Sequence, residues 1–195
     1  MTVTNLAKKQ ILNLESNIVE ERGAAIKVLS IKHDVEIIHL LMTKLKENTS
    51  TQFREGACRI LAELKAKEAL DVLIECLNDP DDGVKFYAAS ALKNISDPRT
   101  VKPILRILNQ ENSDSEFRSE LISTLGNIGD LIAIDPLIGI LRNDKDKFVR
   151  HYAARALGSM KNIKAIGVLK EVAKNEGNTR LHFLALDAIE QIKQG

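Results

Sequence analysis

Tryptophan is absent from this chain of 195 residues, and Phe and Tyr are also scarce, with five and two copies. Cysteine occurs only at Cys58 and Cys76, without a CxxC pair or a Cys/His spacing typical of zinc. Two such thiols do not make the disulfide framework of a secreted domain. No apolar run approaches the roughly 18 residues of a transmembrane helix. The sequence therefore excludes a disulfide-stapled domain, a zinc module and a membrane-spanning protein.

An excess of charge of one sign is missing as well. Lys and Arg number 28 and Asp and Glu number 27, which leaves a net charge of +1. This balance disfavours a protein whose surface is built for nucleic acid or for an acidic membrane. Residues 1–9 lack the basic-then-apolar layout of a signal peptide, so we expect a cytoplasmic location.

Short motifs of known chemistry are not found either. The sequence has no nucleophile elbow, no phosphate-binding glycine loop, no zincin helix and no dinucleotide fingerprint. We therefore expect no catalytic residue, no cofactor and no metal, and the sequence favours a non-enzymatic protein.

What the chain does contain is an internal repeat. Similar segments occupy residues 53–61, 84–92, 117–125, 149–157 and 181–189, and a degenerate copy starts at Glu21. A basic residue marks each copy, and we call its place the basic position: Arg22, Arg54, Lys85, Arg118, Arg150 and His182. Successive basic positions are 32, 31, 33, 32 and 32 residues apart. A period this regular indicates a solenoid.

Each copy has the periodicity of an amphipathic helix. Apolar residues lie one residue before the basic position and three, six or seven after it, which predicts one buried stripe. A second helix is expected over 34–47, 67–78, 99–109, 130–142 and 163–174, and a further one over 4–14. We expect one solenoid domain, 1–195, of about six helix pairs: approximately 4–31, 34–64, 67–95, 99–128, 130–160 and 163–193.

Residues typical of helix N-caps recur at fixed places in these copies. For the second helices they are Asp34, Asp97, Asp130 and Asn162. For the repeat helices they are Thr51, Asp82, Ser115 and Thr179. Pro103 and Pro136 lie early in successive second helices, where the missing N–H costs little.

The segments 136–141 and 149–158 resemble the HEAT-like repeat of the phycobilisome-lyase type. The resemblance covers nearly the whole chain and implies an all-α, right-handed α-solenoid of HEAT-like helix pairs. It also implies that the helix starting with the Val149-Arg150 motif lines the concave face. Some members of that family are lyase subunits that attach bilin chromophores to phycobiliproteins or assist their degradation, and many others are adaptors.

The basic positions allow two interpretations. They could form a phosphate-binding stripe, or each could pair with an acidic residue of a nearby turn. We expect the pairing, because acidic residues recur within a few residues of each base. The expected partners are Asp82, Asp114, Glu116 and Asp146.

The expected concave positions lie one, two, five and nine residues after each basic position. Four of the seven Phe and Tyr residues fall there, and an aromatic cluster beside Arg and His is typical of a protein-binding hot spot. The alternative is that Phe86 and Phe183 fold back onto the adjoining repeat. The candidate partner-binding residues are Phe86, Tyr87, Glu120, His151, Tyr152, Arg155 and Phe183.

Two functions stay open at this point. The first is a non-enzymatic adaptor that binds a protein partner on its concave face. The alternative is a subunit of a phycobilin lyase or a bilin chaperone, in which the same aromatics flank a tetrapyrrole and Arg155 meets a propionate. Nucleic acid is disfavoured because the concave positions hold three bases against four acids. An iron-dependent hydroxylase built on similar repeats would need His-Glu pairs as metal ligands, and the sequence has none.

Overall fold

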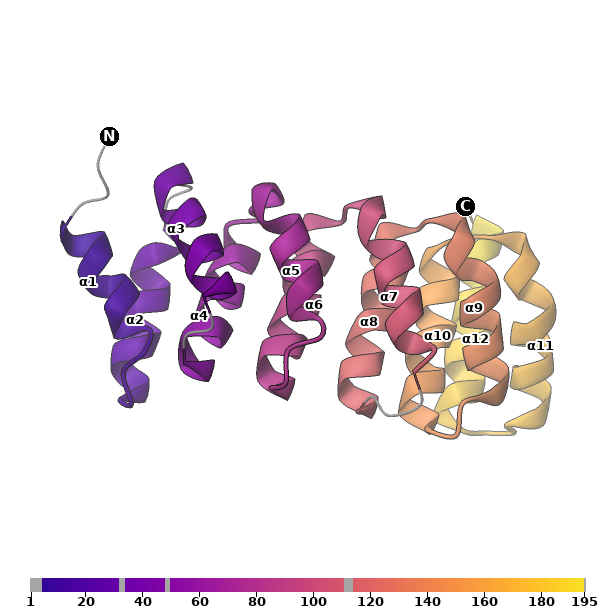
Figure 1. The fold of residues 1–195 in the computed structure, drawn as a ribbon. Coiled ribbons are helices and arrows are strands. Elements are labelled where there is room, and N and C mark those ends of the chain that lie inside the picture. Colours follow the sequence, from indigo (N-terminus) through magenta and orange to yellow (C-terminus); the bar gives the residue numbers. More distant parts are fainter. Residues whose placement is uncertain (1–4, 32–33, 48–49, 111–113, 195) are drawn as a thin grey trace. The chain divides into compact units, whose positions relative to one another are not determined.

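The computed structural model describes residues 5–31, 34–47, 50–110 and 114–194, and within these ranges it contains twelve α-helices and no strand (Figure 1). The α-helices are α1 (Asn5–Asn13), α2 (Val19–Leu29), α3 (Val35–Lys46), α4 (Thr51–Glu63), α5 (Leu70–Cys76), α6 (Asp82–Ile95), α7 (Val101–Leu108), α8 (Ser115–Ile128), α9 (Ile134–Asn143), α10 (Lys147–Ser159), α11 (Ile166–Asn175) and α12 (Arg180–Gln194). None of the helices in these ranges is both long and apolar enough to cross a membrane.

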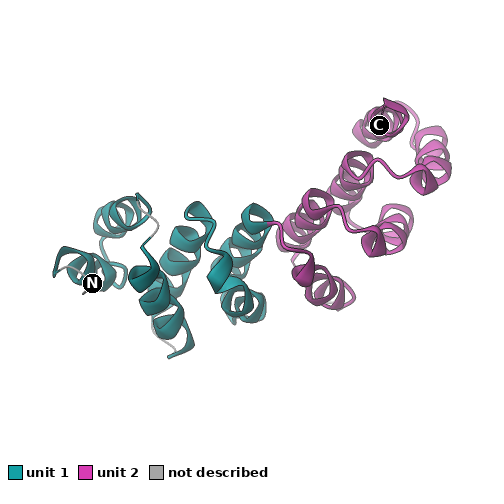
Figure 2. Ribbon diagram, turned by 90° about the horizontal axis from the view of Figure 1, so that it is seen from above, with its two compact units in different colours: residues 1–95 teal, residues 96–195 magenta. Residues whose placement is uncertain are grey.

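The chain divides into two compact units, residues 1–95 (unit 1) and residues 96–195 (unit 2) (Figure 2). We call the even-numbered helices, which carry the basic positions, inner helices, and the odd-numbered ones outer helices. In unit 1 the inner helix α4 packs against α2 and α6, and in unit 2 α10 packs against α8 and α12. Each outer helix packs against the inner helix that follows it. Helix pairs stacked in this way confirm the all-α solenoid class predicted from the repeat.

The buried stripe of the inner helices is also confirmed. Three residues after the basic position, Ala57, Ala88, Leu121, Ala153 and Ala185 are fully buried. Seven residues after it, Leu61, Leu92, Leu125 and Leu157 are fully buried. The small residue allows close approach of a neighbouring helix, and the leucine supplies core volume.

Four outer helices begin with one turn of 3-10 helix, which the sequence pattern did not predict. These turns are η1 (Lys67–Ala69), η2 (Pro98–Thr100), η3 (Leu131–Ala133) and η4 (Ile163–Ala165). The predicted caps Asp97, Asp130 and Asn162 accept a backbone N–H of η2, η3 and η4, and Asp34 caps α3 in the same way. These four caps are therefore confirmed.

The predicted caps of the inner helices are wrong by one residue at three places. Ser50 caps α4 in place of Thr51, and Asp114 caps α8 in place of Ser115. At the start of α6, Asp81 rather than Asp82 accepts the N–H of Val84. Only Thr179 acts as predicted, because its hydroxyl accepts the N–H of His182. Where two polar residues stand side by side, sequence alone does not show which of them has the extended backbone of a cap.

Four inner helices are followed by a residue with positive φ, which lies eleven residues after the basic position and one or two residues beyond the last helical residue. In unit 1 it is Lys65, with φ of 48°. In unit 2 Ser96, Gly129 and Lys161 have φ of 53°, 74° and 49°. This left-handed conformation stops a helix and reverses the chain, and it favours glycine. Only Gly129 has it without steric cost.

Polar side chains tie successive inner helices together within each unit. Asn94 donates its side-chain amide to the carbonyl of Ala62 at 3.3 Å in unit 1. Ser159 donates its hydroxyl to the carbonyl of Gly126 at 3.2 Å in unit 2. Both donors lie nine residues after a basic position, so this expected concave position serves the stacking of repeats.

Most basic positions pair with acidic residues, but the predicted partners are largely wrong. Arg54, Arg118 and Arg150 pair with acids 25 or 26 residues further on, in the turn before the next inner helix: Asp79, Asp144 and Glu176. Lys85 alone pairs with a predicted acid, Asp82, at 2.5 Å. Asp114 and Asp146 serve as helix caps instead. A side chain on the first turn of a helix points toward the N-terminal end, where it meets the neighbouring turn.

The two cysteines lie in the core of unit 1, and their burial agrees with the expectation from the repeat. Cys58 on α4 is fully buried and Cys76 on α5 is 8% exposed, and neither forms a disulfide. A hydrogen bond with Cys76, together with burial, raises the pKa of the Cys58 thiol. A thiol in such surroundings is a poor nucleophile.

Candidate functional site

The inner helices share one face that is mostly exposed or half-buried, which we call the open face: the residues one, two and five positions after each basic position, of which Gly56 and Ser119 are buried. In unit 1 it carries Phe86 and Tyr87 on α6, whose rings meet edge to face with centroids 5.7 Å apart. The guanidinium of Arg59 on α4 lies over the Tyr87 ring, 5.1 Å from its centroid. A cation at this distance is attracted to the ring face, so two successive inner helices hold the tyrosine in place.

A pocket of about 340 Å³ lies on the same unit, between α2 and α4. Its lining comprises Val19, Arg22, Gly23, Ile26, Gln52, Glu55, Gly56 and Arg59. Two bases face one acid, and Arg22 also donates to the Ser16 carbonyl at 2.7 Å. Arg59 is shared between this pocket and the Tyr87 ring, so the hollow and the aromatic pair form one continuous surface.

The open face of unit 2 repeats the pairing of arginine with tyrosine. The Arg155 guanidinium lies 5.8 Å from the centroid of the Tyr152 ring on the same helix, α10. Both tyrosines of the chain therefore lie under a guanidinium. Phe183 on α12 is 55% exposed and packs edge to face against His182 at 5.1 Å. Tyrosine and arginine together are the residues most enriched in protein-binding hot spots.

The predicted site residues divide between the units. Phe86 and Tyr87 lie in unit 1 and touch each other, whereas the remaining five lie in unit 2. In unit 2 the half-buried Glu120 is on α8, the half-buried His151 and Tyr152 and the exposed Arg155 are on α10, and Phe183 is on α12. Phe183 does not fold back into the core, whereas Phe86 is half-buried. That all seven residues form one partner-binding surface stays a prediction.

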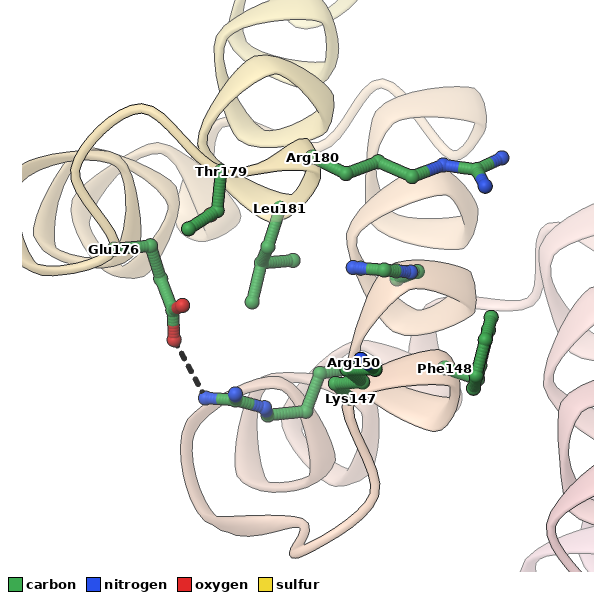
Figure 3. Close-up of a pocket in the computed structure, with 8 residues that line it drawn as sticks. Lys147, Phe148, Arg150, Glu176, Thr179, Arg180 and Leu181 are labelled. Carbon is green, nitrogen blue, oxygen red and sulfur yellow. Dashed lines mark hydrogen bonds and ion pairs between the residues drawn. The ribbon is translucent and has the colours of Figure 1, made fainter.

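A second hollow, of about 360 Å³, lies in unit 2 at the N-terminal ends of α10 and α12 (Figure 3). We call it the basic pocket, and it is lined by Lys147, Phe148, Arg150, His151, Glu176, Thr179, Arg180 and Leu181. Arg150 extends to Glu176, with its Nη1 atom 2.7 Å from Oε1. Arg180 extends away from that pair.

Sequence reasoning missed most of the basic pocket. It singled out His151, but not Lys147, Phe148 or Arg180. A local signal was present, because residues 147–155 contain Lys147, Arg150 and Arg155 with no acid among them. The contribution of Arg180 could not be seen, because it comes from the next repeat.

The environment of His151 reflects the charge of this pocket. Partial burial, and then the nearby positive charges of Arg180, Arg150 and Lys147, lower the pKa of the imidazole below its ordinary value. Phe148 packs edge to face against the same ring at 5.8 Å. His151 is therefore mainly neutral at pH 7, and the cations around it carry the charge of the pocket.

The described residues contain no group of three or more His, Cys, Asp and Glu side chains that could hold a metal ion. What the two open faces and the two pockets offer is a set of aromatic rings, guanidinium groups and hollows. Such surfaces are suited to binding through contact and charge.

The family of this chain follows from its similarity to known proteins. The model of HEAT repeats matches residues 38–115 and 104–190, which is most of the chain. This chain belongs to the HEAT-repeat family. The resemblance seen in the repeat motif is thereby confirmed, and a lyase subunit of the expected type is among the relatives.

Two curated relatives have very different activities. Deoxyhypusine hydroxylase-B of Oryza sativa is 33% identical over 150 residues, which covers 72% of this chain and 49% of the relative. Phycocyanobilin lyase subunit beta of Pseudanabaena tenuis is 28% identical over 145 residues, which covers 74% of this chain and 50% of the relative. The chain thus spans about half the length of these relatives, and their shared property is the repeat.

Among solved structures, a designed armadillo repeat protein in complex with the peptide (KR)4 is similar over 97% of this chain and 100% of that chain. The TM-score is 0.64 and the sequence identity is 19%. This likeness shows the fold of stacked helix pairs alone.

Proposed function

We propose that this HEAT-repeat protein is a non-enzymatic interaction module that binds a protein partner on its open face. The observation that carries the proposal is the stacking of an arginine on each of the two tyrosines, Arg59 on Tyr87 and Arg155 on Tyr152. Four exposed or half-buried side chains are thus paired with one another on the open face. Preorganised aromatic anchors lower the entropy lost on binding.

Helix stacking leaves the open face available for this role. The apolar stripes of the inner helices are buried in the packing between helices. Arg54, Arg118 and Arg150 form ion pairs with acids of the following turns. Tyr87 and Tyr152 belong neither to the buried stripe nor to these ion pairs. Substituting them should therefore change binding much more than stability.

The chemistry of the open face favours a peptide or protein over a polyanion. On unit 1 Glu55 lies beside Arg59, and on unit 2 Glu120 and Asp187 accompany Arg155. Mixed charge around aromatic rings suits a polar and apolar protein surface and repels a continuous phosphate backbone. The designed armadillo repeat protein in complex with the peptide (KR)4 is an example of a repeat protein of similar fold that binds a peptide.

The test begins with affinity capture from the native cell, followed by mass-spectrometric identification of the partner. The affinity of the purified partner is then measured for the wild type, for Tyr87→Ala plus Tyr152→Ala, and for Tyr87→Phe plus Tyr152→Phe. The alanine pair should weaken binding by about tenfold or more, since hot-spot aromatics typically contribute at least that much. The phenylalanine pair keeps the rings and should bind nearly as the wild type does.

Circular dichroism melting supplies the control for folding. Both double variants should keep the helicity of the wild type and melt within a few degrees of it. If the alanine pair binds the identified partner as tightly as the wild type, the open face is not the binding surface.

A second candidate is a subunit of a phycobilin lyase or a bilin chaperone that acts on phycobiliproteins. It is favoured by the similarity to phycocyanobilin lyase subunit beta, which covers 74% of this chain. Co-production with a bilin and its apo-protein, with and without a second lyase subunit, tests this candidate. A coloured covalent adduct that depends on this chain would support it, and the absence of colour in both arrangements would dismiss it.

Hydroxylation is not proposed, although a deoxyhypusine hydroxylase is among the relatives. The four histidines of the chain are followed by Asp34, Leu40, Tyr152 and Phe183 rather than by Glu. The residue pairs that a repeat hydroxylase would need as iron ligands are therefore missing from this sequence.

A further inference from the structure

The basic pocket of unit 2 carries a larger positive excess than the near-neutral balance of the chain as a whole. Lys147, Arg150 and Arg180 line it against one acid, Glu176. The chain as a whole has 28 bases and 27 acids. An excess of two positive charges around a hollow of about 360 Å³ is therefore a local feature.

Two of these cations are available to a ligand. Arg150 is engaged with Glu176 at 2.7 Å, whereas Lys147 and Arg180 form no ion pair with any residue that the structure describes. Both are exposed. The Nε atom of Arg150 is buried and lacks a hydrogen-bond partner among the described residues, so the Arg150 guanidinium is incompletely satisfied.

An apolar surface adjoins the two free cations. Phe148 is 54% exposed, and the Nζ atom of Lys147 lies 5.7 Å from the centroid of its ring. Leu181, which is buried, closes the other side of the hollow. A ligand for this pocket should therefore combine a negative charge with an apolar group.

The helix ends around the pocket add to its positive potential. The first turns of α10 and α12 both meet here, and helix N-termini carry partial positive charge. Asp146 already accepts the N–H groups of Phe148 and Val149, and Thr179 accepts that of His182. Because the caps use these N–H groups, the side chains of Lys147 and Arg180 must supply the direct contacts to an anion.

We infer that the basic pocket binds an acidic peptide segment of a protein partner, with a carboxylate between Lys147 and Arg180 and an apolar side chain against Phe148. The hollow has the volume of one or two side chains, which suits a short segment. A nucleic acid backbone is disfavoured, because a strand would need a continuous stripe of bases, and the bases of this pocket form a local cluster. This inference is independent of the open-face proposal, whose anchors are Tyr87 and Tyr152.

The test uses a peptide of four Leu-Glu repeats, labelled with an uncharged dye and measured by fluorescence anisotropy. The comparison peptides are four Leu-Gln repeats and the cationic (Lys-Arg)4. The acidic peptide alone should bind, and its binding should weaken as salt is raised, because surface charges are screened.

The decisive variant is Lys147→Gln plus Arg180→Gln. Its matched control is Lys102→Gln plus Arg106→Gln on the outer helix α7, which removes the same two charges from exposed positions of the same unit. The pocket variant should weaken the acidic peptide by about tenfold or more, as expected for lost charge-assisted hydrogen bonds. The control should weaken it by less than about twofold, and Phe148→Ala should have an intermediate effect.

A two-dimensional amide NMR titration adds a positional readout. The acidic peptide should shift the signals of residues 147–151 and 180–181 and leave those of α7 in place. An equal loss of affinity for the acidic peptide in the pocket variant and in the α7 control would overturn the inference. The inference would also be overturned if the wild type did not bind the acidic peptide. Oligo(U) RNA and anionic lipid vesicles are tested as further probes. If the pocket variant loses the binding of either probe that the wild type shows, while its affinity for the acidic peptide is unchanged, the inference is also overturned. Tyr87→Ala plus Tyr152→Ala should bind the peptide normally, so this proposal and the open-face proposal fail separately.

Discussion

Arg54 in unit 1 and Arg150 in unit 2 occupy the same position of the repeat, yet their guanidinium groups are held differently. Arg54 donates through Nε and Nη2 to both carboxylate oxygens of Asp79, at 2.7 and 2.9 Å. The two side chains are only 10% and 8% exposed. Arg150 reaches Glu176 through Nη1 alone, and both side chains are 25% exposed. The same repeat position thus builds a closed structural bridge at Arg54 and one wall of a pocket at Arg150.

The residue eight positions after the basic position differs between the units as well. Eight residues after the basic position, unit 1 has Ala62 on α4, whereas unit 2 has Gly126 on α8 and Gly158 on α10. A Cβ atom on Gly126 would lie 2.7 Å from the Cβ atom of Ala156, and one on Gly158 would lie 2.9 Å from the Cα atom of Ala188. The inner helices of unit 2 therefore stack at a separation that only glycine permits.

Among substitutions that test the difference between the units, the largest change in the free energy of unfolding is expected at the paired arginines. Arg54→Ala leaves the buried Asp79 carboxylate without its partner, which should lower the free energy of unfolding by about 3–5 kcal/mol. Arg150→Ala removes a more exposed pair and should cost about 1 kcal/mol or less. Urea denaturation followed by circular dichroism measures both. Equal costs for the two substitutions would show that the ion pairs are equivalent in the two units.

The next largest change in stability is expected at the close glycine contact between inner helices of unit 2. Gly158→Ala places a methyl group against the Ala188 backbone, and such overpacking should cost about 1–3 kcal/mol. Gly139→Ala on α9 is the matched control, because a Cβ atom there meets nothing within 4 Å. This control should stabilise the protein by about 0.5–1 kcal/mol through helix propensity. A neutral Gly158→Ala would mean that α10 and α12 are not in close contact.

A smaller effect is expected at the left-handed residues that end the inner helices. Lys65→Gly in unit 1 should stabilise by about 1 kcal/mol, and Gly129→Ala in unit 2 should destabilise by about 1–2 kcal/mol. Thermal unfolding of each single variant checks the pair. Opposite signs are required, because the two residues share one backbone conformation.

The smallest expected effect is on the pH dependence of stability, and it compares a histidine of unit 2 with one of unit 1. Partial burial, and then the nearby cations, lower the pKa of His151 in the folded state, so the unfolded chain binds more protons near pH 6. The resulting contribution is a loss of stability as the pH falls from about 7.5 to 5.5, through the ordinary histidine range. His151→Gln should reduce that loss, whereas His39→Gln on the exposed face of α3 serves as the control. An unchanged pH profile for His151→Gln would contradict the crowding of cations around this ring.

Sequence reasoning recovered the repeat, the helix pairs and the buried stripe, because these depend on periodicity that recurs in every copy. The predicted ion-pair partners of Arg54, Arg118 and Arg150 are wrong, because the sequence shows only which acids lie nearby along the chain. The actual partners are 25 or 26 residues away and become neighbours only when the next repeat is stacked. Lys85 with Asp82 is the exception, because that pair lies within one helical turn.

The candidate site was predictable to a similar extent. The positions of Phe86, Tyr87, Tyr152 and Phe183 on the exposed side of inner helices follow from the helical period. The stacking of Arg59 on Tyr87 does not, because it joins two repeats. The basic pocket was missed because half of its lining comes from α10 and the other half from α12 and the turn before it. Contacts within one helix follow from spacing, whereas contacts between repeats require the structure.

The most direct test of the open face as the partner-binding surface is hydrogen–deuterium exchange of this chain with and without its identified partner. We expect the partner to slow exchange in the inner helices that carry the arginine–tyrosine stacks, which are α4 and α6 in unit 1 and α10 in unit 2. Protection confined to the outer helices, such as α5, α9 and α11, would contradict this expectation.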